Sequence, residues 1–344
     1  MVDEIFIAIF MPIVVIFGII GNILTITVIV RHQRMRTSVN VYLANMAIAD
    51  AIFLAMAPDL VWTSLTNSPI RDTYDIGIQN PWVCKFNFYV VDATYEVAIF
   101  TIVAMSIERY RAIYHPISFH NNKSVSILRA IQICCFIWFI TLAWQSRKLF
   151  WVEMVEYQFP WPDMYNGLPN LTTACVFCLD DFDCKLDKYL YMFDTCLSLT
   201  LMLVVVGLYT AILIKLRTST FSAAGKTARS KSEKKVFLTV FLAATAYIVC
   251  TAPFDVLNII LTYGDVDYNT SLKAFNILRV ALYMNSSVNP IIYNAVNDEF
   301  RKAFLKIFYC NYRKPKAACA NSDREVGLTT VSLVSYSTTN ITIN

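Results

Sequence analysis

Charged residues are scarce in this 344-residue chain: Asp, Glu, Lys and Arg make up 16% of it, and hydrophobic residues 57%. Because soluble domains carry about 25% charged residues, and the mean hydropathy here is +0.50, a soluble globular protein is excluded. Histidine is scarcer still. His32, His115 and His120 show no metal-ligand spacing, and no nucleophile and base lie within evident reach of each other. The sequence therefore does not predict an enzyme.

Long apolar runs make up much of the chain. A stretch of about 20 apolar residues forms a helix that can cross a bilayer. Seven such stretches are found, at roughly 5–30, 39–65, 86–110, 126–146, 188–215, 236–263 and 274–297. They predict an all-α membrane protein, a bundle of seven transmembrane helices. A transporter would show internal symmetry and paired broken helices, and neither is apparent in this sequence.

Basic residues gather in the loops after the first, third and fifth stretches, where Glu233 is the only acid between the fifth and sixth. The positive-inside rule places these loops in the cytoplasm. With seven crossings, the N-terminus lies outside the cell and the C-terminus inside, in the plasma membrane. The net charge of +4 then describes a cytoplasmic excess that faces anionic lipid, and it does not predict nucleic-acid binding.

Several residues are candidates for covalent modification. The outer, oxidising side holds an even set of cysteines, which permits two disulfides in three connectivities: Cys84, Cys175, Cys178 and Cys184. Asn170 and Asn269 each begin an N-x-S/T glycosylation acceptor on the same side. Cys310 follows an amphipathic stretch at the inner membrane edge, so it is a palmitoylation candidate.

Polar side chains within the apolar stretches are costly in a membrane and usually functional. A group of them shares oxygen or amide chemistry: Asn22, Asp50, Asn285, Ser286 and Asn289. Such hard oxygen ligands suit a sodium ion at Asp50. The alternative is a water-filled hydrogen-bond network without a specific ion. No other cofactor is predicted.

Short motifs stand at particular places along these stretches: Gly21-Asn22, "LANMAIAD" at 43–50, Glu108-Arg109-Tyr110, Trp138, Pro253, and the Asn289-Pro290-Ile291-Ile292-Tyr293 run. As a set they resemble the rhodopsin-like (class A) G-protein-coupled receptors over residues 5–310. "MRTSVNVYLANMAIAD" and "ERYRAIYHPI" look like neuropeptide receptors in particular. The resemblance implies a receptor that activates a heterotrimeric G protein.

The resemblance also assigns roles at the inner end. Arg109 would be a switch residue, held at rest by Glu108 and Glu233 and released when the sixth helix swings outward. Residues that would support the active state or contact the G protein are Tyr110, Tyr209, Asn289, Pro290, Tyr293 and Ile117. Cys84 would pair with a cysteine of the second outer loop, with Cys178 favoured over Cys175.

The C-terminal part completes the resemblance. Phe300, Phe304 and Phe308 recur four residues apart, with Arg301 and basic neighbours elsewhere. This pattern predicts an amphipathic eighth helix at 299–309 on the inner membrane face. It would complete a receptor domain of residues 1–310. The Ser/Thr-rich segment 311–344 is predicted to be a disordered, phosphorylatable tail that recruits receptor kinases and arrestin.

The family places its ligand pocket in the outer halves of its helices, and here that region is rich in acids. Asp92 and Glu96 lie four apart, on one helix face. The predicted ligand-binding residues are Asp92, Tyr95, Glu96, Asp194, Asp255, Asn258, Arg279 and Tyr283. With four acids against one arginine, we expect a cavity that attracts cations. An internal Asp255–Arg279 pair is the alternative.

Three ligand classes can be compared. A basic or amidated neuropeptide fits the long, acidic second outer loop at about 147–187. An amine receptor would carry its aspartate seven residues after Cys84, where Val91 stands, although a small cationic amine remains the alternative. A retinal pigment would need a lysine at the depth of Tyr283, and Lys273 lies only at the outer edge.

The chain departs from the family pattern at several positions. Leu201 stands where the family usually has proline, and Ala98 where a serine often completes the sodium site. In the sixth stretch, Tyr247 replaces phenylalanine and Thr251 replaces tryptophan. We hypothesise that Tyr247 and Pro253 carry the transmission between the ligand pocket and the cytoplasmic end.

Overall fold

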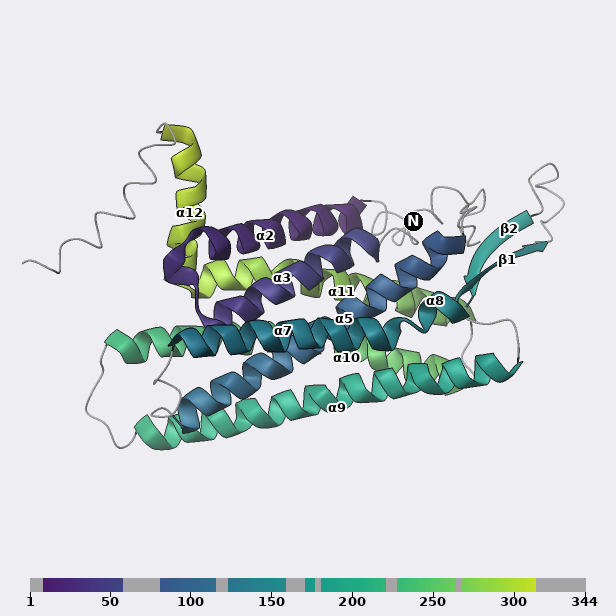
Figure 1. Cartoon of the computed structure of the whole chain (residues 1–344). Coiled ribbons are helices and arrows are strands. Elements are labelled where there is room, and N and C mark those ends of the chain that lie inside the picture. The colour runs from purple at the N-terminus through teal and green to yellow at the C-terminus, as the bar shows by residue number, and fades with distance from the viewer. Residues whose placement is uncertain are drawn as a thin grey trace, which may run out of the picture.

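The computed structural model describes residues 9–57, 81–115, 123–158, 171–176, 181–220, 228–263 and 268–313. Seven long helices in this part of the chain form one bundle (Figure 1). They are α2 (Met11–Arg31), α3 (Ser38–Met56), α5 (Pro81–Tyr114), α7 (Lys123–Gln145), α9 (Asp181–Thr220), α10 (Ala228–Tyr263) and α11 (Tyr268–Val296). A short η2 (Gln33–Met35) joins α2 to α3. The predicted all-α, seven-helix fold is confirmed.

Six of the seven helices are long and apolar enough to span a membrane when the described residues are considered, and α11 is the exception. Its side chains explain the difference, because it carries Arg279, Asn285, Ser286 and Asn289 within the predicted span. α11 nevertheless packs against α10, α2 and α3. The polar residues of the seventh span thus lie on a helix enclosed by neighbours, where other side chains can satisfy them.

The first helix shows the inside-out polarity expected of a membrane protein. Ile13, Phe17 and Ile20 are 60%, 56% and 53% exposed, while Asn22 and Thr25 are completely buried. Exposed apolar side chains are compatible with a lipid environment, and the buried polar ones form hydrogen bonds inside the bundle. Apolar pattern and helix length therefore identify the span, and the few polar residues identify the face that turns inward.

Pro253 lies inside α10, and the helix continues through it to Tyr263. A proline removes one backbone hydrogen bond, which neighbouring helices and water can compensate in a membrane protein. Pro253 lies on the exposed side of the helix, and Asp255 two residues later is buried. Pro253 and Asp255 therefore lie on different faces of α10. The hinge role of Pro253 remains a prediction.

The two ends of the bundle differ in what covers them. At one end, the single-turn α8 (Lys148–Trp151) leads into an antiparallel hairpin of β1 (Glu153–Gln158) and β2 (Leu171–Val176), with Glu153 paired to Val176. We call this the hairpin end (Figure 1). The predicted outer loop thus contains regular structure, and α9 begins seven residues before the predicted 188.

At the opposite end, α12 (Asp298–Arg313) extends from α11 and packs against α11 and α2 (Figure 1). We call this the α12 end. The buried Phe300 ring lies 6.0 Å from the Tyr293 ring, whereas Arg301 on the same helix is exposed. The helix begins one residue before the predicted 299 and continues to Arg313, so residues 311–313 are helical. The rest of the predicted tail lies outside the described residues.

Candidate functional site

A cavity of about 630 Å³ lies in the hairpin-end half of the bundle and is lined mainly by α5, α9, α10 and α11. The structure brings all the predicted ligand-binding residues to its wall: Asp92, Tyr95, Glu96, Asp194, Asp255, Asn258, Arg279 and Tyr283. Four helices far apart in sequence supply them. Because these residues line one cavity, it is the candidate ligand site. Ligand binding by these residues remains a prediction.

One side of the cavity is rich in ion pairs. Arg147, at the start of α8, pairs with Asp194 of α9. The ammonium of Lys148 is completely buried, 3.6 Å from Asp92 Oδ2 and 3.8 Å from Asp187 Oδ1. Two cations of the chain therefore already occupy the neighbourhood of three cavity acids.

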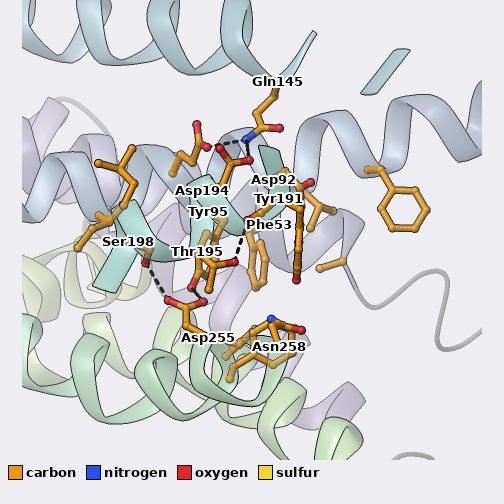
Figure 2. A pocket seen from close by; sticks show the side chains of 18 of the residues that line it. Phe53, Asp92, Tyr95, Gln145, Tyr191, Asp194, Thr195, Ser198, Asp255 and Asn258 are labelled. Atoms are coloured by element: carbon orange, nitrogen blue, oxygen red, sulfur yellow. Dashed lines mark hydrogen bonds between the residues drawn. The ribbon is translucent and has the colours of Figure 1, made fainter. Parts of the chain in front are cut away.

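Neutral donors from the same segment complete this side. Gln145 Nε2 donates to Glu96 Oε1 at 2.6 Å and to Asp194 Oδ2 at 3.4 Å, and Trp144 Nε1 donates to Asp194 Oδ1 at 2.8 Å. Figure 2 shows Gln145 and Asp194 together at this side. We call the donor-bearing segment, residues 144–148, the donor segment.

The predicted balance of four acids against one arginine is therefore wrong. Residues 147–187 were predicted to form the second outer loop, so Arg147 and Lys148 were not counted among the charges of the pocket. Asp187 and Lys188, which line the cavity, were not counted either, since α9 begins earlier than expected. The available signal was a pair of cations directly after an apolar stretch, beside a group of acids in the next helix.

The other side of the cavity is organised around Asp255 of α10, which is 3% exposed. The Tyr95 hydroxyl donates to Asp255 Oδ1 at 2.7 Å, and Ser198 Oγ donates to Oδ2 at 2.8 Å (Figure 2). Asp255 thus ties α10 to α5 and α9 through hydroxyls. These contacts, not the alternative pair with Arg279, hold the carboxylate in the described structure, although Arg279 lines the same cavity.

Two of the positions that depart from the family pattern, Tyr247 and Thr251, lie eight and four residues before Asp255 on α10. The ring centroids of Tyr95 and Tyr247 are 6.5 Å apart. The Tyr247 hydroxyl and Thr251 Oγ1 are buried and have no hydrogen-bond partner among the described residues. Neither side chain is among those that line the cavity, so the stretch of α10 that precedes Asp255 carries two buried hydroxyls without described partners.

Between the cavity and the α12 end lies a polar network centred on Asp50. Asn289 Nδ2 donates to Asp50 Oδ2 at 2.9 Å, and Asn22 Nδ2 donates to the Ser286 carbonyl at 2.8 Å. The side-chain carbonyl oxygens of Asn22, Asn285 and Asn289 are buried without a hydrogen-bond partner in the described part of the chain. Buried oxygens of this kind are normally satisfied by water or an ion.

A second polar contact joins three helices. Trp138 Nε1 of α7 donates to Asn45 Oδ1 of α3 at 2.9 Å, and Asn45 Nδ2 donates to Thr101 Oγ1 of α5 at 2.8 Å. The Trp138 indole and the "LANMAIAD" segment therefore meet in space. This contact explains why a polar asparagine and a tryptophan occur within apolar stretches.

At the α12 end of α5, Arg109 lies 3.6 Å from Glu108 Oε1, and Ser38 of α3 donates a hydrogen bond to the same oxygen. The hydroxyls of Tyr209 and Tyr293 are buried without partners among the described residues. The role of Ser38 was not predicted, because a serine at the start of an apolar stretch gives no signal of its contact with Glu108.

Some predicted residues fall outside what the structure describes. Ile117, Asn170 and Cys178 lie outside the described residues, and the side chains of Glu233, Asn269 and Cys310 are not described. Cys84 takes part in a disulfide bond. Its partner is not determined, because the side chains of the candidate cysteines in 175–184 also lie outside the described part.

The structure is a bundle of seven helices, six of them apolar enough to span a membrane, with a cavity toward one end and polar motifs at the other; this is the architecture of a seven-helix membrane protein. The family model of the 7 transmembrane receptor (rhodopsin family) matches residues 21–293, and the chain belongs to this family. The family consists of receptors, not enzymes.

Curated relatives agree with this assignment over most of the chain. Galanin receptor 2a of Danio rerio is 24% identical over 91% of this chain and 80% of its own length. Somatostatin receptor type 2 of Sus scrofa is 27% identical over 86% of this chain and 74% of its own. The Allatostatin-A receptor of Bombyx mori is 27% identical over 88% and 79%, respectively.

Proposed function

We propose that this receptor binds an extracellular peptide with a basic or amidated group and activates a heterotrimeric G protein. The observation that carries the proposal is the large cavity at the hairpin end, whose wall includes the buried carboxylate of Asp255. Relatives named for galanin, somatostatin and allatostatin-A support a peptide ligand. A small cationic amine is the second candidate, since the same carboxylate would attract it.

The proposed topology places the hairpin end outside the cell and the α12 end in the cytoplasm. The excess of Lys and Arg in the loops at the α12 end supports it. Asn170 and Asn269 would then face an environment where glycosylation occurs, and Cys310 would lie where palmitoylation occurs.

Coupling would use the groups at the α12 end. Arg109 is held by Glu108 at rest and becomes available when the end of α10 that carries Glu233 moves outward. Tyr209 and Tyr293 support this proposal, because their buried hydroxyls are without described partners and can gain hydrogen bonds in another arrangement. Receptor kinases and arrestin are proposed to act on the Ser/Thr-rich tail.

We further propose that the Asp50 network holds a sodium ion. The carboxylate of Asp50 and the partnerless amide oxygens of Asn22, Asn285 and Asn289 are hard oxygen donors of the type that suits such a cation. The ion would supply a positive charge that compensates the buried carboxylate. Ala98 leaves this site without the serine that often completes it.

The test is a screen of neuropeptides and amines in cells that express the full chain and a promiscuous G protein, with intracellular calcium as the readout. A response to a basic or amidated peptide supports the proposal. Activation only by amines, or only by light after retinal is added, contradicts it. Cells without the receptor provide the control for endogenous responses.

A further inference from the structure

The five carboxylates of the cavity wall fall into two groups according to their partners. Four of them receive a hydrogen bond or ion pair from the donor segment: Asp92, Glu96, Asp187 and Asp194. Asp255 is different, because both groups that contact its carboxylate in the described structure are neutral hydroxyls, those of Tyr95 and Ser198. Glu96 and Asp255 are therefore the two acids without a described ion pair, and Asp255 alone also receives nothing from the donor segment.

A buried carboxylate that has hydrogen bonds but no cation is incompletely compensated. Asp255 is only 3% exposed, and it faces a cavity of about 630 Å³ that has room for an occupant. Asn258, one helical turn further along α10, lines the same wall and adds an amide to this side. An occupant with a positive group would supply the missing counter-charge.

We propose that Asp255 is the subsite for the ligand's cationic group, an ammonium or guanidinium. The other four acids form ion pairs or hydrogen bonds with Arg147, Lys148 or Gln145 of the receptor's own donor segment. The inference rests on the proposed function, which it deepens by naming the acid that recognises the ligand. It also separates Asp255 from Asp92 and Glu96, which the sequence analysis treated as equivalent.

A second observation connects this subsite with the rest of α10. Tyr247 and Thr251 lie eight and four residues before Asp255, on the same helix face, and their buried hydroxyls have no described partner. A cation at Asp255 competes with the Tyr95 hydroxyl for the carboxylate. Because Tyr95 and Tyr247 are neighbours, with ring centroids 6.5 Å apart, the released hydroxyl can rearrange toward Tyr247.

The subsite can be tested without knowing the natural ligand. The full-length receptor in lipid nanodiscs is titrated with n-butylguanidinium, and with n-butylurea as a neutral analogue of similar shape, while its apparent Tm is measured. We expect the cation to raise the apparent Tm by about 2–5 °C near saturation, and the urea to have no effect. Asp255→Asn should abolish the shift.

Asp187→Asn is the matched control, since it makes the same change in an acid held by the donor segment. It removes a partner of the buried Lys148, so we expect a lower apparent Tm without probe but an unchanged probe-induced shift. Asp255→Asn should keep the apparent Tm without probe, because the amide oxygen can still accept from a hydroxyl. No shift in wild type, an equal shift in Asp255→Asn, or loss of the shift in Asp187→Asn overturns the proposal.

Ser198→Ala provides an independent variant if Asp255→Asn does not fold. It removes a competing hydroxyl from the carboxylate, so n-butylguanidinium should bind about two- to tenfold more tightly. Unchanged or weaker binding contradicts the proposal.

Signalling assays separate this proposal from the proposed function. If a basic peptide activates the receptor, Asp255→Asn should lower its potency at least about 30-fold. Wild-type potency in that variant overturns the subsite and leaves the peptide function intact. If no peptide activates the receptor but the guanidinium shift depends on Asp255, the subsite stands and the peptide function fails.

Discussion

The two halves of the bundle treat buried polar groups in different ways. In the hairpin-end half, ion pairs join different helices and segments: Arg147 pairs with Asp194, and Lys148 lies between Asp92 and Asp187. In the half toward the α12 end, the core is mostly aliphatic and aromatic, the ion pair Arg109–Glu108 joins neighbours on one helix, and the hydroxyls of Tyr209 and Tyr293 have no described partners.

This difference suggests different mechanical roles. Ion pairs in a low-dielectric environment hold their helices in one arrangement, because separating the charges is costly. A buried hydroxyl without a partner gains a hydrogen bond when the helices rearrange. The hairpin-end half is therefore organised for a fixed binding site, and the other half for a change of state.

Arg147→Met should destabilise the hairpin-end half of the bundle, because it removes the ion pair with Asp194. Asp194 would lose its cation while remaining largely buried, and removing one partner of a buried pair costs about 3–5 kcal/mol. We expect a marked fall in apparent Tm of the receptor in detergent. The double variant Arg147→Met/Asp194→Leu should recover much of this loss, since no unpaired charge remains. A single variant as stable as wild type would show that the pair does not hold α8 and α9 together.

Tyr247 lies at the junction of the two halves, and two substitutions separate its volume from its hydroxyl. Tyr247→Ala leaves a cavity at a site that is 1% exposed, which should cost about 3–5 kcal/mol and abolish ligand-driven signalling. Tyr247→Phe removes a hydroxyl that has no described partner, so stability should change by less than about 1 kcal/mol while signalling falls. Thermal unfolding measures the change in stability, and the agonist response, normalised to surface expression, measures the change in signalling. Intact signalling in both variants would exclude a transmission role for Tyr247.

Ser38→Ala addresses the resting contact at the α12 end. Ser38 and Arg109 both contact Glu108 Oε1, so loss of the serine hydroxyl leaves this oxygen to Arg109. Ligand-independent G-protein activation should then fall by about two- to fivefold, measured by nucleotide exchange and normalised to surface expression. Ser38→Thr keeps the hydroxyl and serves as the control. A rise in basal activation would indicate that Ser38, rather than Arg109, stabilises the resting state.

The smallest effect is expected at the surface of the α12 end. Lys235 of α10 contacts Asp298 of α12, and the hydrogen bond from Lys235 lowers the pKa of Asp298. The lowered pKa means that the contact persists at neutral pH and is lost only in acid, as the pH falls below the usual aspartate value of about 4. Because both side chains are exposed, Asp298→Asn should change basal activation by less than about threefold. A larger rise, absent in Arg301→Gln, would make this contact a principal restraint on α10.

Much of the fold could be predicted because the relevant signals are local. Seven apolar runs define seven helices, and the polar residues within them define the inward faces. Asp92, Glu96, Asp194 and Asp255 were identified as pocket residues in this way, although they lie on three different helices. Trp138 and Asn45 were noted as motif residues, and their hydrogen bond explains both.

The partners of those residues could not be predicted. Whether Asp255 contacts Arg279 or hydroxyls depends on how α5, α9 and α10 are rotated against each other, and no local pattern reports that rotation. Ser38 illustrates the same limit, since its contact with Glu108 joins residues seventy positions apart.

Length and hydropathy along the chain predicted a seven-helix membrane protein, because lipid imposes one-dimensional requirements on each span, and the short motifs added the resemblance to receptors. Which of the cavity acids already have a cation became visible only in the folded chain. The donor segment follows an apolar helix and looks like the start of a loop, yet it folds against α5 and α9. Charge compensation depends on distances of a few ångströms between helices, and only the folded chain defines those distances.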